Sequence, residues 1–421
     1  LHLLSRRQRQ MCIRDRVDTM RKTKSSVKQL FIPGMLFENM GLTYLGPVDG
    51  HNMRQMMKLF NEAKRVEGPV VVHVLTKKGR GYEPASAHPD RFHGTGPFDI
   101  KTGRVLQKKT VPGYTDVFSK ALVSLGEKNK KLTAITAAMP DGTGLVEFSR
   151  RFPDRFFDVG IAEEHAVSFA AGLALGGLVP VVAIYSSFLQ RAVDQILHDV
   201  CMQKLHVIFA VDRAGLVGAD GETHQGCFDL SYLSMMPNMT VLAPKNDREL
   251  EEMLAFAVSF DGPIAIRYPR GSAHQGLREY QAPVEYGRSE IIRKGKKIAV
   301  LGVGSMIPSC MEICKGLKDD GYDPTFVNAR FVKPLDVDLL DELAKDHSLF
   351  VTVEENVKSG GYGEHVSAYM EACHPEIRVL SAAVWDRFVP QGNVESLRSR
   401  IGLGVEDIRQ AIEDSEELKE Q

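Results

Sequence analysis

The sequence predicts an α/β protein built from parallel sheets with helices on both faces, followed by a smaller α/β domain near the C-terminus. Short apolar stretches alternate with segments of helical periodicity between residues 114 and 269. The alternation resumes after a polar segment at 271–287. The length of 421 residues also exceeds what one hydrophobic core usually spans, so we expect two or three domains.

Residues 17–105 are predicted to form the C-terminal part of a first α/β domain. A helical pattern covers 52–66, and an apolar stretch typical of a buried strand covers 69–75. Residues 1–16 are densely basic and lack apolar periodicity, so we interpret them as an artefact or a disordered leader. The segment 101–113 has no periodicity and is predicted to be a linker.

Residues 112–277 are predicted to form a second domain around a parallel sheet. In such folds, ligands bind beyond the carboxyl ends of the strands, and the polar sequences IAEEH, YSSF and VDRAG lie at strand ends. The expected strands are 132–136, 179–184, 206–211, 240–243 and 263–267, and the expected helices are 115–127, 163–176, 188–203 and 247–260.

Residues 288–415 are predicted to form the smaller third domain. Its GVGS sequence follows a strand but lacks the third glycine of a dinucleotide-binding fingerprint, which argues against that function. An acidic amphipathic helix is expected at 405–420. The expected strands are 297–302, 324–328, 349–354 and 378–381.

Composition argues against several classes of partner. The 53 basic and 54 acidic residues give no electrostatic reason to expect nucleic acid or an anionic membrane as a partner. The six cysteines have no CxxC pair and no histidine at ligand spacing, so we expect reduced thiols. No apolar stretch approaches the roughly 18 to 20 residues of a membrane span. We therefore expect a cytoplasmic protein, with a plastid origin left open.

Residues 158–172, DVGIAEEHAVSFAAG, place two carboxylates and a histidine at the start of a helix of small residues. Glu163 and Glu164 are stabilised there by the helix dipole, whether or not they act chemically. Adjacent side chains of a helix diverge by about 100°, so we expect Glu164 to face away from Glu163. His165 is expected to be structural.

Several longer motifs resemble the thiamine-diphosphate enzymes of the transketolase superfamily, and among them the 1-deoxy-D-xylulose-5-phosphate synthases. The resemblance extends from about residue 17 to the end, and it implies a transketolase-like pyrimidine-binding domain followed by a transketolase C-terminal domain. The motifs are YLGPVDGHN (44–52), TKKGRGYEPASAHPDRFHG (76–94), GIAEEHAVSFAAGLA (160–174), IYSSFLQRAVDQ (184–195), DRAGLVGADGETHQGCFDLSYL (212–233) and IRYPRG (266–271).

The resemblance implies which residues contact the cofactor. Glu163 would hydrogen-bond to a ring nitrogen of the aminopyrimidine, and Glu164 stands where the family more often has glutamine. Phe188 would stack on the same ring, although core packing is an equally good interpretation of its position. Ile161 and Tyr82 would also contact the cofactor, and Tyr82 could instead be a surface anchor.

The resemblance also implies groups for the second substrate. Tyr185, Arg191 and Arg270 would hold the phosphate of D-glyceraldehyde 3-phosphate, because arginine binds phosphate oxygens with two parallel hydrogen bonds. Taken singly, each arginine could be an ordinary surface ion pair. His224 lies in the glycine-rich sequence GADGETHQG and is a candidate for proton transfer. Asp220 would orient His224 or contact the hydroxyl groups of the acceptor.

Two histidines lie in the first-domain motifs. His93 would face the cofactor adduct as a catalytic residue, and His51 would support the geometry of its loop. No G-D-G motif followed by an asparagine is present to bind the Mg²⁺ of thiamine diphosphate, so this chain is expected to supply no metal ligand.

The implied enzyme is a transferase that condenses pyruvate with D-glyceraldehyde 3-phosphate, releases CO₂ and forms a precursor of isoprenoids, thiamine and pyridoxal. We expect a homodimer, and we expect this chain to be truncated, to hold thiamine diphosphate and Mg²⁺ weakly, and to be inactive alone. Two alternatives remain open: another enzyme of the superfamily, or a short non-catalytic partner protein.

Overall fold

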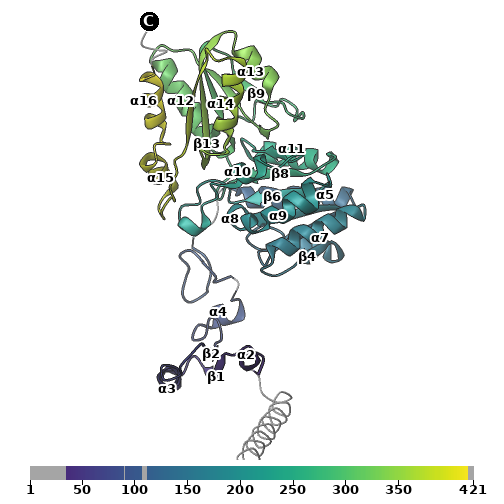
Figure 1. Ribbon diagram of the computed structural model, residues 1–421, viewed down its shortest axis with the longest axis vertical. Helices are drawn as coiled ribbons and strands as arrows, with labels where there is room; N and C mark the ends of the chain where they lie inside the picture. Colours follow the sequence, from purple (N-terminus) through teal and green to yellow (C-terminus); the bar gives the residue numbers. More distant parts are fainter. Residues whose placement is uncertain (1–34, 90, 107–110, 416–421) are drawn as a thin grey trace, which may run out of the picture. The chain divides into compact units, whose positions relative to one another are not determined.

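A computed structural model describes residues 35–89, 91–106 and 111–415, which form two compact units, Leu1–Lys109 and Thr110–Gln421 (Figure 1). The segment 1–16, for which we predicted an artefact or a disordered leader, lies outside the described residues. In the described ranges, no helix combines the length and the apolar composition that crossing a membrane requires.

The first unit contains a small parallel β-α-β motif. Strand β1 (Thr43–Asp49) pairs in parallel with β2 (Val70–Leu75), and α3 (Met53–Ala63) connects them. The Asn52 side chain caps α3 by accepting a hydrogen bond from the Gln55 backbone N–H at 3.2 Å. The predicted helix and strand are thus confirmed. The unit also contains the short helices α2 (Met35–Asn39) and α4 (Glu83–Ala87).

The second unit is organised around a seven-stranded sheet of order β12-β7-β8-β6-β5-β3-β4. All neighbouring strands are parallel except β12, which runs antiparallel to β7. The strands are β3 (Leu132–Thr136), β4 (Phe156–Asp158), β5 (Val179–Tyr185), β6 (Ile208–Asp212), β7 (Thr240–Leu242), β8 (Ile264–Tyr268) and β12 (Phe331–Lys333).

Helices cover both faces of this sheet, as predicted. Along β5, Val182 and Ile184 join the core cluster under α7 (Glu163–Leu175), whereas Val181 and Ala183 join the cluster on the opposite face. That opposite face is covered by α5 (Tyr114–Lys128) and α11 (Asp247–Ser259), whereas α10 (Asp229–Ser234) lies with the α7 cluster. The short helix α6 (Val146–Arg151) packs against α5.

The helix expected at 188–203 is not continuous. The chain instead forms α8 (Ser186–Leu189), a 3₁₀ turn (Gln190–Ala192), α9 (Val193–Gln195) and a π-helix (Ile196–Cys201). The buried positions in this segment are spaced as in an α-helix, because Leu189, Ala192, Ile196 and Val200 all face the core. Apolar spacing predicts which face is buried, but it does not reveal a change of hydrogen-bonding register.

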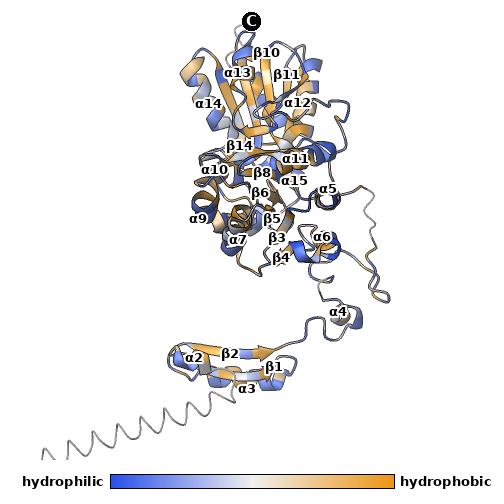
Figure 2. Ribbon diagram, turned by 90° about the vertical axis from the view of Figure 1, so that its right-hand side faces the viewer, coloured by the Kyte–Doolittle hydropathy of each residue, from blue (hydrophilic) through white to orange (hydrophobic). Residues whose placement is uncertain are grey.

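The C-terminal part forms a five-stranded sheet of order β14-β13-β10-β11-β9, whose apolar strands lie inside helices with hydrophilic outer faces (Figure 2). Only β9 is antiparallel to its neighbour. Its strands are β9 (Glu290–Arg293), β10 (Lys297–Gly302), β11 (Thr325–Asn328), β13 (His347–Val357) and β14 (Arg378–Val384), and its helices are α12 (Ile307–Asp319), α13 (Val337–Leu343), α14 (Tyr362–Cys373), α15 (Val394–Arg400) and α16 (Val405–Glu413).

The second and third predicted domains are joined into one unit by long-range contacts. Strand β12 lies beyond the start of the third domain, yet it adds an edge strand to the seven-stranded sheet. A buried ion network also crosses the boundary: the Lys245 ammonium lies 2.6 Å from Glu290, and Arg330 lies 3.0 Å from both Glu249 and Glu290. Its two cations and two anions balance, which offsets the cost of burying them. The limits 112–277 and 288–415 stay predictions.

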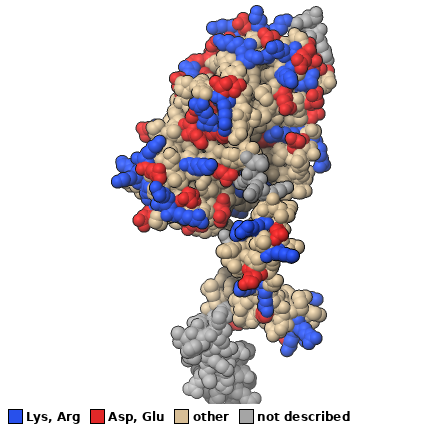
Figure 3. All heavy atoms as spheres, turned by 180° about the vertical axis from the view of Figure 1, so that it is seen from behind, with Lys and Arg blue, Asp and Glu red and all other residues tan. Residues whose placement is uncertain are grey.

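Both signs of charge are mixed over the second unit on the face shown in Figure 3. This distribution agrees with the formal net charge of −1. Any binding of an anionic ligand therefore depends on individual arginines rather than on a broad basic surface.

Candidate active site

The motifs of the second unit converge at the carboxyl edge of the seven-stranded sheet. Helix α7 follows β4, α8 follows β5, the loop 213–226 follows β6, and Arg270 lies just beyond β8. Strands β4, β3, β5, β6 and β8 are parallel neighbours in that order, so their carboxyl ends share one edge. This is the edge where open α/β sheets bind ligands.

Glu163 is the first residue of α7 and is only 2% exposed. Glu164 and His165 are exposed, so the two acids diverge as predicted. Ile161, two residues before Glu163, is 82% exposed. The start of α7 therefore buries one carboxylate and leaves an apolar side chain uncovered beside it.

Arg191 holds the buried Glu163 carboxylate. Its Nη1 donates to Glu163 Oε1 at 2.5 Å, and its guanidinium lies 5.0 Å from the centre of the Phe188 ring. The Arg191 side chain is 48% exposed, so one side of the guanidinium meets solvent. Its contacts are thus with the predicted cofactor-binding residues, and its role in phosphate binding stays a prediction.

An aromatic row continues from Arg191 across the site. The Phe188 ring stacks on Tyr185 with 5.5 Å between ring centres and meets His224 edge-on at 5.3 Å. Thr223 Oγ1 lies 2.9 Å from His224 Nδ1. The structure therefore brings together residues from three separate motifs, 160–174, 184–195 and 212–233. The first two motifs supply residues predicted to bind the cofactor or the phosphate, and the third supplies His224, predicted for proton transfer.

Arg213 is a site residue that the sequence analysis missed. Its guanidinium lies 3.7 Å from the centre of the Tyr185 ring, and its Nη1 donates to the Gly142 carbonyl at 2.8 Å. Arg213 has a φ of +58°, a conformation uncommon for a residue with a side chain. An arginine directly after the β6 strand end, in the sequence VDRAG, was the available signal.

The acid beneath Arg213 is fully buried. Asp212 lies 3.0 Å from Arg213 and accepts a hydrogen bond from Thr115 Oγ1 at 2.9 Å. Burial raises the pKa of Asp212 to about 6, although Arg213 and Thr115 both favour the ionised form. Burial also raises the pKa of Tyr185, and the charge of Arg213 opposes this shift.

The position of the Tyr185 hydroxyl depends on a glycine. A Cβ atom on Gly142 would lie 1.8 Å from the Tyr185 hydroxyl oxygen, so any other residue at 142 would displace Tyr185 or the loop. Gly142 therefore lets the loop after β3 close against Tyr185.

Arg270 forms an ion pair with Asp220 at the tip of the loop 213–226. Their side chains are 42% and 40% exposed, so the pair is open to solvent. Asp220 was expected to orient His224 or to contact the acceptor; the partner observed here is Arg270. Both groups influence the electrostatic environment of Tyr185.

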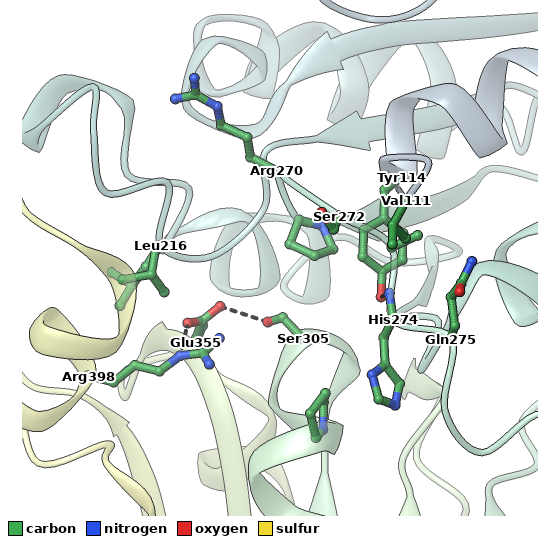
Figure 4. A pocket seen from close by; sticks show the side chains of 14 residues that line it. Val111, Tyr114, Leu216, Arg270, Ser272, His274, Gln275, Ser305, Glu355 and Arg398 are labelled. Carbon is green, nitrogen blue, oxygen red and sulfur yellow. Dashed lines mark hydrogen bonds and ion pairs between the residues drawn. The ribbon is translucent and has the colours of Figure 1, made fainter. Parts of the chain in front are cut away.

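A cavity of about 530 Å³ lies beside this pair, between the seven-stranded sheet and the C-terminal sheet (Figure 4). The buried Glu355 accepts hydrogen bonds from Ser305 Oγ at 2.7 Å and Arg398 Nε at 2.8 Å. The Arg270 side chain extends away from these three residues in Figure 4. Over the described parts of the chain, no cluster of His, Cys, Asp and Glu has the geometry to hold a metal ion.

Tyr82 and His93 belong to the first unit. The Tyr82 hydroxyl donates to the Ile100 carbonyl at 2.9 Å, and its ring packs against Phe92 and Phe98. His93 Nδ1 lies 2.8 Å from Lys78 Nζ. Because both residues lie in the other unit, their proposed contacts with cofactor stay predictions.

His51 has the supporting contact that the sequence suggested. Its Nε2 accepts a hydrogen bond from the Lys77 backbone N–H at 2.8 Å, which ties the loop after β1 to the segment after β2.

Known protein families match most of the chain. The transketolase pyrimidine-binding domain matches residues 111–275, and the transketolase C-terminal domain matches residues 287–408. A 1-deoxy-D-xylulose-5-phosphate synthase model matches residues 3–76, so the match begins before residue 17, where we expected the resemblance to start.

Curated relatives share the same name. The 1-deoxy-D-xylulose-5-phosphate synthase of Lachnoclostridium phytofermentans is 54% identical over 393 residues, covering 93% of this chain and 63% of the relative. The chain belongs to the transketolase superfamily, and it is similar to this synthase over most of its length. The synthase of Natranaerobius thermophilus is 51% identical over 390 residues, covering 92% of this chain and 62% of the relative. The chain thus spans about 62–63% of the length of these synthases.

Solved structures agree with this placement. A structure described as "Split gene transketolase, inactive beta4 tetramer" is 30% identical with a TM-score of 0.64, covering 73% of this chain and 98% of that one. A transketolase from Campylobacter jejuni has a TM-score of 0.61 at 16% identity, covering 92% of this chain and 70% of that one. The second comparison supports the fold alone.

Proposed function

We propose that this chain carries the pyrimidine-side and acceptor-side residues of a thiamine-diphosphate-dependent 1-deoxy-D-xylulose-5-phosphate synthase. The reaction condenses pyruvate with D-glyceraldehyde 3-phosphate, releases CO₂ and forms 1-deoxy-D-xylulose 5-phosphate. The observation that carries the proposal is the unbroken series of contacts from Glu163 through Arg191 and Phe188 to Tyr185 and His224.

The residues at the start of α7 fit the aminopyrimidine of thiamine diphosphate. Glu163 is a buried carboxylate that can hydrogen-bond to a ring nitrogen, and Phe188 offers an aromatic face within the same group of contacts. When bound, the cofactor supplies the carbanion that attacks the keto carbon of pyruvate. Arg191 holds Glu163 in place, and the exposed Ile161 adds apolar surface beside it.

The residues around the loop 213–226 fit a phosphorylated aldehyde. Arg270, Arg191 and Tyr185 supply donors for the phosphate, and Arg213 adds positive charge beside the Tyr185 ring. In this proposal, Asp220 exchanges its ion pair with Arg270 for the hydroxyl groups of the acceptor. His224 moves a proton at the aldehyde oxygen, because a histidine side chain can both donate and accept a proton.

We assign the Mg²⁺ and diphosphate ligands to polypeptide beyond this chain. The first unit supports this assignment, since parallel sheets are normally covered on both faces. Helix α3 has no buried residue, and its Met53 and Met57 are 69% and 62% exposed. Tyr82 and His93 would face the cofactor once this unit is completed. We therefore propose that the chain binds cofactor weakly and is inactive alone.

We also propose that the chain associates with a second copy of itself. Leu175 on α7 is 66% exposed, and Gly172 on the same helix has open space around it. An apolar helix with an uncovered side is typical of a helix that packs against another protein. The related split-gene transketolase chain is described as an inactive β4 tetramer, which supports self-association without activity.

A reducing, cytoplasmic location is part of the proposal. Cys310 and Cys314 lie one turn apart on α12, and both are buried as free thiols. Buried thiols left unpaired are ordinary in compartments that keep cysteine reduced.

The test is complementation in solution. The part of the Lachnoclostridium phytofermentans synthase that this chain does not cover would be expressed separately and mixed with this chain, thiamine diphosphate and Mg²⁺. We expect product from pyruvate and D-glyceraldehyde 3-phosphate in the mixture and from neither part alone. Activity with a ketose phosphate donor but not with pyruvate would indicate a transketolase instead. A mixture that associates but turns over no donor would favour a non-catalytic partner protein.

A further inference from the structure

The loop 213–226 carries the acceptor-side residues Asp220 and His224 at its tip. Its neck is closed by paired backbone hydrogen bonds between Gly215 and Gly226, at 2.7 and 2.8 Å. Asp220 and Thr223 are exposed at the tip. Gly215 at the neck and Gly218 and Gly221 farther along the loop have φ values of +78°, +72° and +80°, which glycine adopts without steric strain.

Gln225 links this tip to the C-terminal domain. It is 4% exposed, and its Oε1 accepts the backbone N–H groups of Val217 at 2.8 Å and Gly218 at 3.3 Å. Its Nε2 donates to the carbonyl groups of Val389 at 3.4 Å and Pro390 at 3.2 Å. One buried amide therefore joins the loop to a segment 164 residues away.

Two further contacts tie the same elements together. The Gly392 N–H donates to the Gly218 carbonyl at 3.2 Å, and a Cβ on Gly218 would lie 2.6 Å from the Gly392 carbonyl oxygen. Glu355 of β13 packs against Gly215, where an added Cβ would lie 2.4 Å from its Oε2. The loop is thus supported from both sides by a domain that contains none of the predicted site residues.

We propose that Gln225 is a positioning residue through which the segment 389–392 sets the conformation of the loop 213–226. The part of this proposal that concerns the acceptor rests on the proposed function. Because Asp220 and His224 lie on the supported tip, loss of the Gln225 link weakens binding of the phosphorylated aldehyde. Glu163 and Arg191 lie outside the loop, so the step that uses pyruvate is unaffected.

Hydrogen exchange of this chain measures the link directly, without cofactor or substrate. Gln225→Met removes all four hydrogen bonds, whereas Gln225→Glu keeps the acceptor oxygens and loses the donors to 389 and 390. In the methionine variant, we expect exchange about tenfold faster at Val217 and Gly218 and in peptides covering 386–392. In the glutamate variant, 386–392 should exchange faster, and Val217 and Gly218 should do so by a smaller factor, because the loop loses its link to 389 and 390 but keeps its own bonds to residue 225. Gln410→Glu, at an exposed position of α16, is the matched control and should change neither region.

Peptides from β6 and β8 report whether each variant is folded, because these strands are buried. Unchanged exchange at both 215–224 and 386–392 in a folded Gln225→Met variant would overturn the proposal. If that variant does not fold, the glutamate variant still decides: faster exchange at 386–392 supports the link, and unchanged exchange refutes it.

Steady-state kinetics of the complemented enzyme test whether losing the Gln225 link weakens acceptor binding but not the step that uses pyruvate. Gln225→Glu is expected to raise KM for D-glyceraldehyde 3-phosphate about tenfold and to leave pyruvate decarboxylation without acceptor unchanged. An equal loss of both would show a general structural role and contradict the proposal. If the wild-type mixture shows no turnover, the proposed function is wrong. Hydrogen exchange still tests the link between Gln225 and the segment 389–392, because it needs no activity.

Discussion

Glu163 and Asp220 belong to the same candidate site, but different parts of the protein hold them. Glu163 is held by Arg191, 28 residues along the chain, and they follow β4 and β5, the two strands that flank β3 in one sheet. Asp220 lies on a glycine-rich loop whose supports, Glu355 and the segment 389–392, come from the C-terminal domain. The contacts that hold Glu163 are therefore formed within one domain, whereas those that hold the acceptor loop depend on two.

Because of this difference, we expect some substitutions to affect only the residues around them and others to affect a distant part of the site. Substitutions at the start of α7 should alter chemistry and leave the rest of the unit intact. Substitutions at Glu355 or near 389–392 should alter the acceptor loop without contacting a substrate. Four further experiments test the contrast, from the largest expected effect to the smallest.

Glu163→Gln should have the largest effect, because it removes the only buried carboxylate at the start of α7. In the complemented enzyme, we expect product formation to fall by about 10²- to 10⁴-fold, the usual contribution of an acid–base group. Glu164→Gln is the matched control, since the neighbouring acid is exposed, and it should retain activity. Equal losses in the two variants would contradict the assignment.

Glu354→Gln tests the C-terminal domain without touching the acceptor loop. Glu354 accepts the backbone N–H groups of Tyr362 and Gly363 at the start of α14, and burial raises its pKa from 4.5 to about 7. Between these values the folded state binds more protons than the unfolded state, so the free energy of unfolding falls as pH rises.

We expect that free energy to decrease by roughly 2 to 3 kcal/mol from pH 4.5 to pH 7 because of Glu354. Denaturant unfolding across this range should show a shallower decrease in Glu354→Gln. A smaller decrease up to about pH 6 should persist, because the pKa of Asp212 is also raised. Identical pH dependence in the two proteins would contradict this account.

Gly215→Ala tests the contact between the acceptor loop and Glu355. The added Cβ would meet Glu355 Oε2, and the residue would also be strained at a φ of +78°. Gly177→Ala is the control, since Gly177 has a φ of +80° and open space around it. We expect Gly215→Ala to cost roughly 1 to 3 kcal/mol more than the control in the free energy of unfolding. Equal costs would indicate backbone strain alone.

Arg213→Lys should have the smallest effect. Lysine keeps the charge beside Asp212 but loses the flat guanidinium over Tyr185, which contributes about 0.5 to 1 kcal/mol. Thermal unfolding should detect this difference against Arg151→Lys, whose exposed pair with Glu127 contributes little. If both variants unfold like the wild type, the contact with Tyr185 has no stabilising value in the free chain.

Local patterns predicted most elements of the second unit. Alternating apolar segments located the parallel strands and the helices on both faces, because burial on a sheet or helix imposes a period on the sequence. The continuous helix at 188–203 was wrong, since 3₁₀ and π turns preserve the buried positions and change only the hydrogen bonds. The divergence of Glu163 and Glu164 followed from helix geometry and is confirmed.

By itself, the sequence determined the α/β class, the motifs at the strand ends and the family. Only the tertiary structure decided that Arg191 pairs with Glu163, that Arg213 lies over Tyr185 and that β12 completes the larger sheet. It also decided that Gln225 reaches the segment 389–392. These contacts join residues far apart in the chain, and they depend on which strands become neighbours. Local periodicity reports which side chains are buried but not which distant segment covers them.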